Sequence, residues 1–166
     1  MSDSHLVHVT FVCSGNICRS PMAEKMFGHQ IAQRGLSHLV RVSSAGTGGW
    51  HVGDGADERA NAVLRGHGYP TEHCAAQLGD DHLAADLVVA LGRNHLRMLT
   101  HLGVEPERIR LLRSFDPRSG AHADDVEDPY YGGPTDFEET FTVIESALPG
   151  LHAWVDERLG GAGLTG

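Results

Sequence analysis

Short apolar runs alternate with helix-like patterns along most of the chain. Four runs have the length and composition of buried strands, and they lie at 5–12, 40–46, 85–91 and 108–112. Between and after them, apolar residues recur at helical spacing, and the start and stop residues predict helices over 20–35, 56–68, 93–103 and 136–159. Strands separated by helices are typical of a parallel sheet joined by right-handed crossovers.

This pattern predicts an α/β fold, with a twisted four-stranded parallel sheet flanked by helices on both faces. A length of 166 residues fits a single domain that can bury its own core. We expect that domain to span 1–166, with its core at about 5–159 and a frayed tail at 160–166.

The ends of two helices carry more detailed expectations. Ser20 and Pro21 suit the N-cap and first position of the first helix. Pro149 should interrupt or kink the last helix. Residues 114–135, rich in Asp, Pro and Gly, predict a long loop before it.

Composition narrows the function classes. The formal charge of -9 argues against nucleic acid as a partner, so an anionic substrate needs a local binding site. We expect no membrane partner and a cytoplasmic location, because no signal peptide and no membrane-length apolar segment stand out. The polar composition favours a monomer.

Cysteine and histidine usage bears on redox and metal chemistry. The three cysteines cannot all pair, which argues against a disulfide framework. A reactive thiol therefore remains an open hypothesis. The twelve histidines are scattered and no CxxC pair or HExxH motif appears, so we expect neither a metal nor a cofactor.

The stretch VCSGNICRSP carries the most chemistry, because it follows a strand and leads into a helix. The amides of the loop and the positive end of the helix dipole make an anion cradle. These amides and Arg19 should favour the thiolate of Cys13, while Arg19 grips two oxygens of a tetrahedral anion. Ser20 could donate to the sulfur. Alternatively, Cys13 could be an unreactive core thiol at the end of a strand. The context of strand, loop and helix favours a catalytic cysteine over this alternative.

A second candidate lies far downstream in EDPYY. Pro129 restricts Asp128 to an extended conformation and helps to aim its side chain. A protonated Asp128 could give its proton to a leaving oxygen and later activate water. The alternative is a solvated acidic run, and the residues themselves do not decide between the two.

Together, VCSGNICRSP and EDPYY closely resemble the low-molecular-weight protein tyrosine phosphatase family. The resemblance extends from about His8 to Leu159 through SAGTGGWHVG, HGYPTEH, SFDPRSG and FTVIESALPGLHAWVDERL. It implies hydrolysis of phosphotyrosine through a cysteinyl-phosphate, with Cys13 as nucleophile, Arg19 as phosphate clamp and Asp128 as general acid and then base. Phosphotyrosine proteins or peptides would be the substrates.

The resemblance also implies roles for other residues. It makes an amide cradle of Ser14, Gly15, Asn16, Ile17, Cys18 and Arg19. It assigns loop support to Asn16, Ser20, Ser44 and His73. It places the walls of a deep substrate slot at Trp50, His51, Tyr130 and Tyr131. Ordinary packing is the alternative for each wall residue.

Regulation is implied by the resemblance alone. A tyrosine kinase would act on Tyr130 and Tyr131, and a disulfide between Cys13 and Cys18 would protect the nucleophile. Export as a virulence effector that acts on host phosphoproteins would then occur without a signal peptide. Gly92 departs from the family, which usually has Asp there, and this puts one hydrogen bond beneath the phosphate loop in doubt.

Two other functions remain open. An arsenate reductase shares this fold and loop but needs a further pair of thiols, whereas Cys74 stands alone. A phosphotyrosine-binding module would hold the phosphate without cleaving it, and the joint presence of Cys13, Arg19 and Asp128 argues against that.

Overall fold

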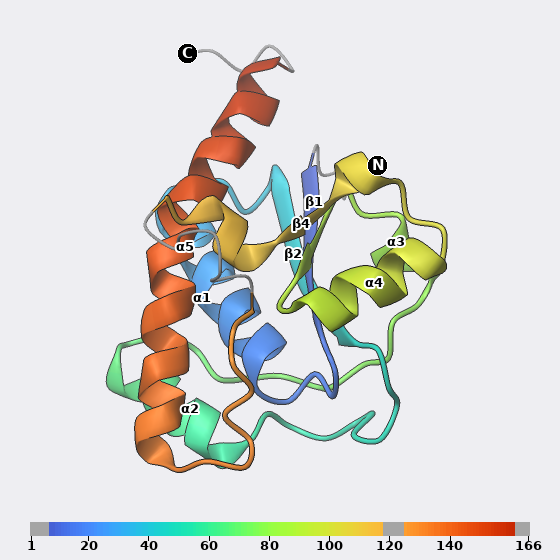
Figure 1. Cartoon of the computed structure of the whole chain (residues 1–166). Helices are drawn as coiled ribbons and strands as arrows, with labels where there is room; N and C mark the ends of the chain where they lie inside the picture. Colours follow the sequence, from blue (N-terminus) through green and yellow to red (C-terminus); the bar gives the residue numbers. More distant parts are fainter. Residues whose placement is uncertain (1–6, 118–124, 162–166) are drawn as a thin grey trace.

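A parallel β-sheet forms the centre of the molecule (Figure 1). The computed structural model describes residues 7–117 and 125–161. Four strands lie in the order β2-β1-β3-β4, all parallel, and they are β1 (Val7–Cys13), β2 (Val40–Gly46), β3 (Leu87–Ala90) and β4 (Ile109–Leu111). The strand order changes direction between β1 and β3, and ligands bind in such sheets outside the carboxyl ends of the strands.

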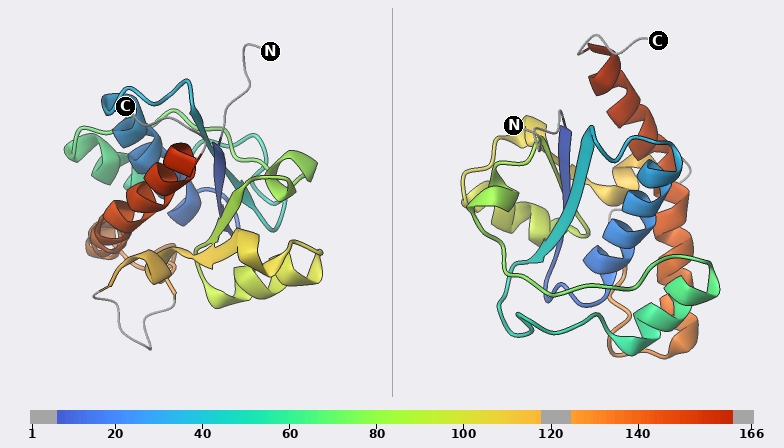
Figure 2. Two further views of the ribbon diagram at one scale, coloured as in Figure 1. Left: turned by 90° about the horizontal axis from the view of Figure 1, so that it is seen from above. Right: turned by 180° about the vertical axis from the view of Figure 1, so that it is seen from behind.

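Helices cover both faces of this sheet. Their bounds are α1 (Arg19–Gln33), α2 (Glu58–Gly66), α3 (Asp80–Leu83), α4 (Arg93–His101) and α5 (Pro134–Gly161), with 3-10 turns at η1 (Pro106–Arg108) and η2 (Leu112–Phe115). Figure 2 shows α1, α2 and α5 on one side of the sheet and α3 and α4 on the other. The predicted fold class is therefore confirmed.

The central strands send alternate side chains into two cores. Phe11 and Val89 pack in the core beneath α1 and α5, whereas Val12 and Val88 pack in the core beneath α4. This alternation follows from the two-residue period of a strand. Cys13 is two residues beyond Phe11, so it belongs to the α1 side, at the carboxyl edge of the sheet.

The predicted N-cap of the first helix is wrong by two residues. α1 begins at Arg19 and Cys18 is its N-cap, with no side-chain cap. Ser20 therefore lies inside the first turn. Its hydroxyl does not cap the helix but forms hydrogen bonds with Cys13 Sγ and Asn16 Nδ2.

The last helix is longer than predicted. It starts at Pro134 and continues through Pro149 to Gly161 without interruption, although its axis bends in Figure 1. Close packing accompanies the Pro-Gly pair, since a Cβ atom at Gly150 would overlap the carbonyl of Phe115. Gly160 and Gly161, predicted to belong to a frayed tail, are helical, and 162–166 lie outside the described residues.

Smaller differences concern short elements. α2 is shorter than the predicted helix because Asp57 caps it, accepting from Arg59 N. Gly68, the predicted stop, does adopt the left-handed backbone that ends a helix, with φ +84°. α3, η1 and η2 were not predicted, and none is longer than four residues. The first two residues of the predicted strand 5–12, and part of the predicted loop 114–135, lie outside the described residues.

Candidate active site

The candidate nucleophile, Cys13, lines a cavity at the carboxyl edge of the sheet. The cavity has a volume of about 450 Å³. Its lining contains the predicted phosphate loop, acid and slot walls: Cys13, Ser14, Gly15, Ile17, Cys18, Arg19, Trp50, His51, Asp128, Tyr130 and Tyr131. The fold thus brings residues from three distant parts of the chain into one hollow.

Ser20 is placed to donate to the sulfur. Its Oγ lies 2.9 Å from Cys13 Sγ and accepts from Asn16 Nδ2 at 2.8 Å. Because that oxygen already accepts from the amide, its own hydrogen is available for the sulfur. A hydroxyl that donates to sulfur stabilises the thiolate over the thiol.

Asn16 organises the loop from inside. It has φ +60°, a left-handed conformation that asparagine tolerates better than most residues. Its Nδ2 also donates to Ser44 Oγ at 2.9 Å, and its Oδ1 accepts from Ala76 N at 2.9 Å. The buried side chain therefore ties the loop to β2 and to the segment after it.

His73 supports the same residue from outside. Its Nε2 donates to the carbonyl of Asn16 at 2.7 Å, while burial lowers the pKa of this ring despite that bond. Glu24, one turn after Ser20 on α1, accepts from Ser44 Oγ. All four predicted support residues therefore meet around the loop, and Glu24 joins them.

Arg19 is buried and connects the loop with the segment that carries Asp128. Its Nη1 donates to the carbonyl of Val126 at 3.0 Å, and its Nη2 lies 3.5 Å from Asp128 Oδ2. Asp128 is half-exposed, and its Oδ1 accepts from Tyr130 N at 3.1 Å. The guanidinium and the candidate acid thus form an ion pair in the lining of the cavity.

The slot walls differ greatly in exposure. Trp50 and Tyr131 are 74% and 91% exposed, whereas Tyr130 is 37% exposed. The ring of Trp50 lies directly over Gly48, where no Cβ atom would fit without moving it. His51 is close to Gly15 and lies 3.3 Å from Asp54. These positions suit a mouth that an incoming aromatic group would contact.

Arg59, from α2, fixes the loop that bears the two tyrosines. It donates to the carbonyls of Tyr130 and Gly132, both at 3.0 Å. Asp57 holds the guanidinium by two further bonds of 3.0 Å, which raises the pKa of Arg59. The rings of Tyr130 and Tyr131 meet edge to face at 4.9 Å.

The remaining cysteines are free thiols. Cys18 is buried, and that burial raises its pKa, with Asp57 and Cys13 adding to the effect. It is therefore a protonated thiol at neutral pH. Its predicted disulfide with Cys13 stays a prediction. Cys74 is exposed on the surface.

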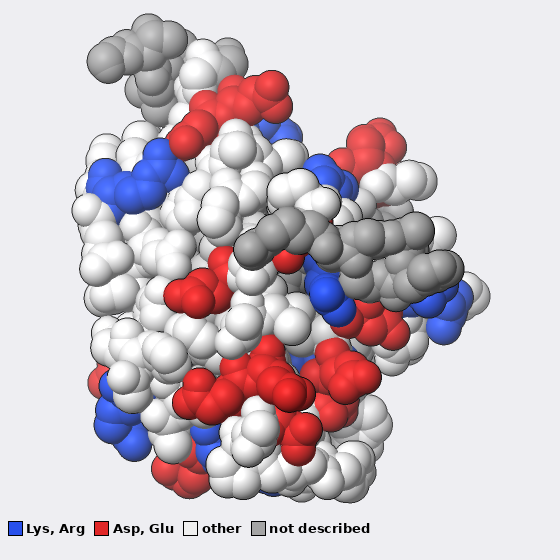
Figure 3. Space-filling view, turned by 60° about the vertical axis from the view of Figure 1, so that its left-hand side comes forward, with Lys and Arg blue, Asp and Glu red and all other residues white. Residues whose placement is uncertain are grey.

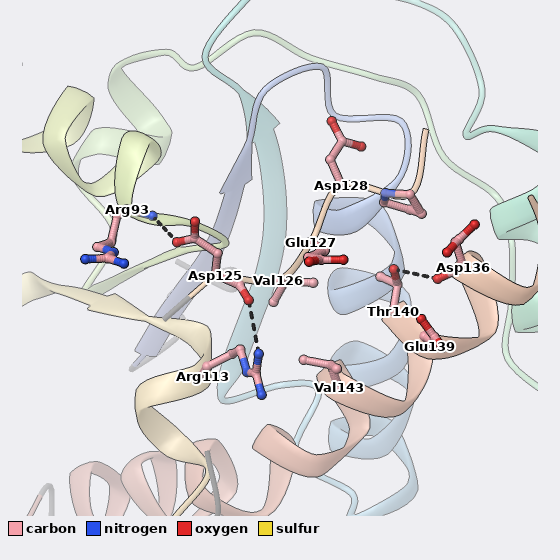
Figure 4. Close-up of a pocket in the computed structure, with 11 residues that line it drawn as sticks. Arg93, Arg113, Asp125, Val126, Glu127, Asp128, Asp136, Glu139, Thr140 and Val143 are labelled. Carbon is pink, nitrogen blue, oxygen red and sulfur yellow. Dashed lines mark hydrogen bonds between the residues drawn. The ribbon is translucent and has the colours of Figure 1, made fainter. Parts of the chain in front are cut away.

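At Gly92, where the resemblance leads us to expect an aspartate, a carboxylate from another segment lies close by. Asp125 Oδ1 would lie 3.4 Å from a Cβ atom at Gly92, and it accepts from Arg93 N at 2.8 Å. A carboxylate from another segment thus serves the start of α4. Figure 4 shows this bond at one side of a second cavity of about 350 Å³, where the carbonyl of Asp125 accepts from Arg113.

Several residues of the site were not predicted. Glu24, Arg59 and His95 come from three helices, and each bonds a predicted site residue or its loop. Glu24 lies four positions after Ser20, on the same helical face, so helical spacing could have identified it. The two carbonyls of the tyrosine loop that accept from Arg59 are more than seventy positions away, so spacing could not have identified this contact.

Acidic side chains surround the second cavity. Glu127, Asp136 and Glu139 line it with Asp125 and Asp128, and Figure 3 shows acidic side chains gathered on the face that includes α5. Within 7–117 and 125–161, no group of three or more His, Cys, Asp and Glu side chains could hold a metal ion. No helix in these ranges is long and apolar enough to cross a bilayer.

Known proteins are similar to this chain over most of its length. Residues 8–160 match the model of the low molecular weight phosphotyrosine protein phosphatase family. The chain is 73% identical to low molecular weight protein-tyrosine phosphatase A of Mycobacterium tuberculosis, over 96% of both chains.

Solved structures agree with this assignment. A protein tyrosine phosphatase from Entamoeba histolytica superimposes with a TM-score of 0.84 and 28% identity, covering 91% of this chain and 97% of the other. A Drosophila arginine phosphatase has a TM-score of 0.80 and 30% identity, covering 89% and 96%. With the family match across nearly the whole sequence, this chain belongs to the low molecular weight phosphotyrosine protein phosphatases.

Proposed function

We propose that this member of the family hydrolyses phosphotyrosine in two steps, through a phosphate held on Cys13. One observation carries the proposal: Cys13, Arg19 and Asp128 line the same cavity, and Cys13 Sγ lies 2.9 Å from a hydroxyl that can donate to it. Every proton transfer that the reaction needs then has a residue to perform it.

In the first step, the thiolate of Cys13 attacks phosphorus. A sulfur-phosphorus bond forms, the bond from phosphorus to the tyrosine oxygen breaks, and Asp128 gives its proton to that oxygen. Arg19 and the loop amides hold the other phosphoryl oxygens, where a planar guanidinium can bind two at once. The products are a cysteinyl-phosphate and a free tyrosine hydroxyl.

In the second step, the carboxylate of Asp128 takes a proton from water. The water oxygen bonds phosphorus as the bond to sulfur breaks, which releases phosphate and restores the thiolate. Ser20 donates to that thiolate as it leaves, and Asp128 is again protonated for the next turnover.

Aromatic walls favour a flat substrate. Trp50 and the two tyrosines at the mouth can contact a phenyl ring. The phosphate of phosphoserine sits on a shorter side chain and would not reach Cys13 while its peptide stays at the mouth. We expect phosphotyrosine proteins or peptides as substrates for this reason.

The decisive experiment is rapid-quench hydrolysis of matched phosphopeptides in the presence of a chelator. Wild-type protein should turn over the phosphotyrosine peptide with a burst equal to the enzyme concentration. Cys13→Ser should abolish turnover, and Asp128→Ala should slow it by about 100-fold or more. A phosphoarginine peptide belongs in the set because one structural relative is named an arginine phosphatase.

Other outcomes would point elsewhere. Binding of the phosphotyrosine peptide without turnover by wild-type protein would indicate a binding module. Reduction of arsenate with added thiols, in the absence of peptide hydrolysis, would indicate an arsenate reductase. Faster turnover of phosphoarginine than of phosphotyrosine would overturn the substrate assignment.

Further proposals concern the protein in its cell. Residues 1–166 would form one phosphatase domain that acts as a monomer, first in the cytoplasm and then, by export, on host phosphoproteins. A tyrosine kinase could modify Tyr131, whose side chain is almost fully exposed, and Tyr130 beside it. Phosphate on either would repel the dianionic substrate, so in vitro phosphorylation should raise KM.

A further inference from the structure

His95 is a buried residue of α4 that contacts the phosphate loop. Only 1% of it is exposed, and its Nε2 lies 2.9 Å from Ser14 Oγ, in hydrogen-bond contact. Ser14 directly follows the candidate nucleophile. This bond therefore joins α4 to the first residue of the loop that would receive the phosphate.

Ser14 is held by two separate parts of the fold. Gly48 N donates to its carbonyl at 3.0 Å, and the backbone of Gly46 is so close that a Cβ atom there would lie 2.7 Å from the same oxygen. The main chain of Ser14 is thus fixed by the end of β2 and the loop after it, and its side chain is fixed by α4.

The start of α4 also holds the segment that carries the candidate acid. Arg93 N donates to Asp125 Oδ1, and Val126 N donates to the carbonyl of Leu91, both at 2.8 Å. Asp128 follows on the same segment, three residues after Asp125 and two after Val126. A single short stretch of structure, from Leu91 to His95, therefore contacts both halves of the site.

Packing alone does not explain a histidine at this position. Among the described residues, His95 Nδ1 is buried and has no hydrogen-bond partner. An apolar side chain of similar size would fill the space without that unpartnered atom, which burial makes costly. Burial, followed by the nearby charge of Arg19, lowers the pKa of His95 to about 4, so the ring is neutral at neutral pH.

We propose that His95 is a positioning residue, which through Ser14 holds the phosphate loop in register with the segment that carries Asp128. The inference rests on the proposed function, because its main consequence is for phosphoryl transfer. Small displacements between reacting groups lower the rate of the chemical step sharply. The hydrogen bonds from Arg19 to the bound phosphate would persist. The role should therefore appear in kcat more than in KM.

A double-mutant cycle between His95 and Ser14 tests this role. His95→Leu and Ser14→Ala should each lower kcat for the phosphotyrosine peptide by about five-fold, the effect of one net hydrogen bond, with KM changed less than two-fold. The double variant should be no slower than either single variant. His95→Gln, which keeps a polar group at similar reach, should recover most of the rate.

The control is His101→Gln on the exposed end of α4, which should leave kcat unchanged. If the two single effects multiply in the double variant, or if His95→Leu lowers only thermal stability, His95 is a packing residue and the proposal fails. Vanadate affinity, measured by calorimetry without turnover, should weaken by the same factor and show the same coupling. An inactive wild-type protein would therefore overturn the proposed function while the vanadate cycle still decides the role of His95.

Discussion

Asn16 shows how much of the site can depend on one residue. It combines the left-handed backbone of the loop with three side-chain hydrogen bonds, while its carbonyl accepts from His73. Each partner is wholly or partly buried, so its loss cannot be made good by bulk water. The backbone shape of the phosphate loop is therefore maintained largely by a side chain within it.

Asn16→Ala should weaken both the fold and catalysis. We expect a loss of about 3 kcal/mol in the free energy of unfolding, because buried groups lose their partners and alanine disfavours a positive φ. Urea denaturation measures the first effect and kcat the second. Asn94→Ala, at an exposed position of α4, is the control, and equal midpoints for the two variants would contradict the assignment.

At the scale of elements, the site is built where secondary structures meet without room for side chains. β2 ends at Gly46, and a Cβ atom there would lie 3.0 Å from Gly15 C and 3.1 Å from Asn16 N. Backbone atoms cannot move aside as a flexible side chain can. Gly28, in the middle of α1, has only ordinary contacts with Val42, at 3.8 Å.

Two glycine substitutions should therefore have opposite effects. Gly46→Ala should displace the phosphate loop and lower kcat by about 100-fold, since an error of about 1 Å at the reacting groups has that cost. Gly28→Ala should raise the free energy of unfolding by about 1 kcal/mol, because alanine is the better helix former, with kcat unchanged. Turnover measures kcat, and urea denaturation measures the free energy of unfolding, for both variants. A Gly46→Ala protein with wild-type kcat would contradict the proposed close packing of β2 against the phosphate loop.

α2 contributes Arg59 to the site. Removing that side chain frees the carbonyls of Tyr130 and Gly132, which should loosen one wall of the slot. Arg59→Ala should raise KM for a phosphotyrosine peptide by about five-fold, as expected for loss of one or two net hydrogen bonds. Steady-state kinetics with Arg65→Ala, at an exposed position of the same helix, as control provide the test. A fall in kcat at constant KM would show instead that Arg59 serves the chemical step.

At the scale of the whole molecule, buried histidines make stability depend on pH. His95 and His73 are neutral in the fold, because burial lowers the pKa of each from its usual value of 6.5. The unfolded chain therefore binds more protons below that value, and folding stability falls as pH decreases. The charges around His95 are Arg19, Asp125 and Asp128, and those around His73 are Glu24 and Lys25.

For His95 the window runs from about pH 6.5 down to about pH 4, its pKa in the fold. Across it, the wild-type protein should lose about 3 kcal/mol that His95→Leu does not lose, since each pKa unit corresponds to about 1.4 kcal/mol. Urea denaturation of both proteins from pH 7 to pH 4 gives the difference. Parallel stability profiles would show that His95 is not neutral in the fold.

Local pattern was sufficient for much of this protein. Strand periodicity, helix stops and the order of elements predicted the four-stranded α/β fold, because these follow from the spacing of apolar residues and from glycine at helix ends. The chemistry of VCSGNICRSP identified Cys13 and Arg19 as candidates, because this stretch follows a strand and leads into a helix. Asp128 was a candidate whose role the residues around it left open, and the family resemblance supplied that role. Short elements such as α3 and η2 were not predicted, because four residues are too few to show a helical period of apolar residues.

Tertiary structure alone decided which distant residues serve the site. Serine is a residue type that commonly caps helices, yet the hydroxyl of Ser20 forms a hydrogen bond with the sulfur of Cys13, because the fold places the two side by side. The contacts of Asp125 with Arg93, of Arg59 with the tyrosine loop and of His95 with Ser14 join segments separated by 32 to 81 positions. Periodicity reports only which face a residue occupies, whereas such contacts depend on how strands and helices pack in three dimensions.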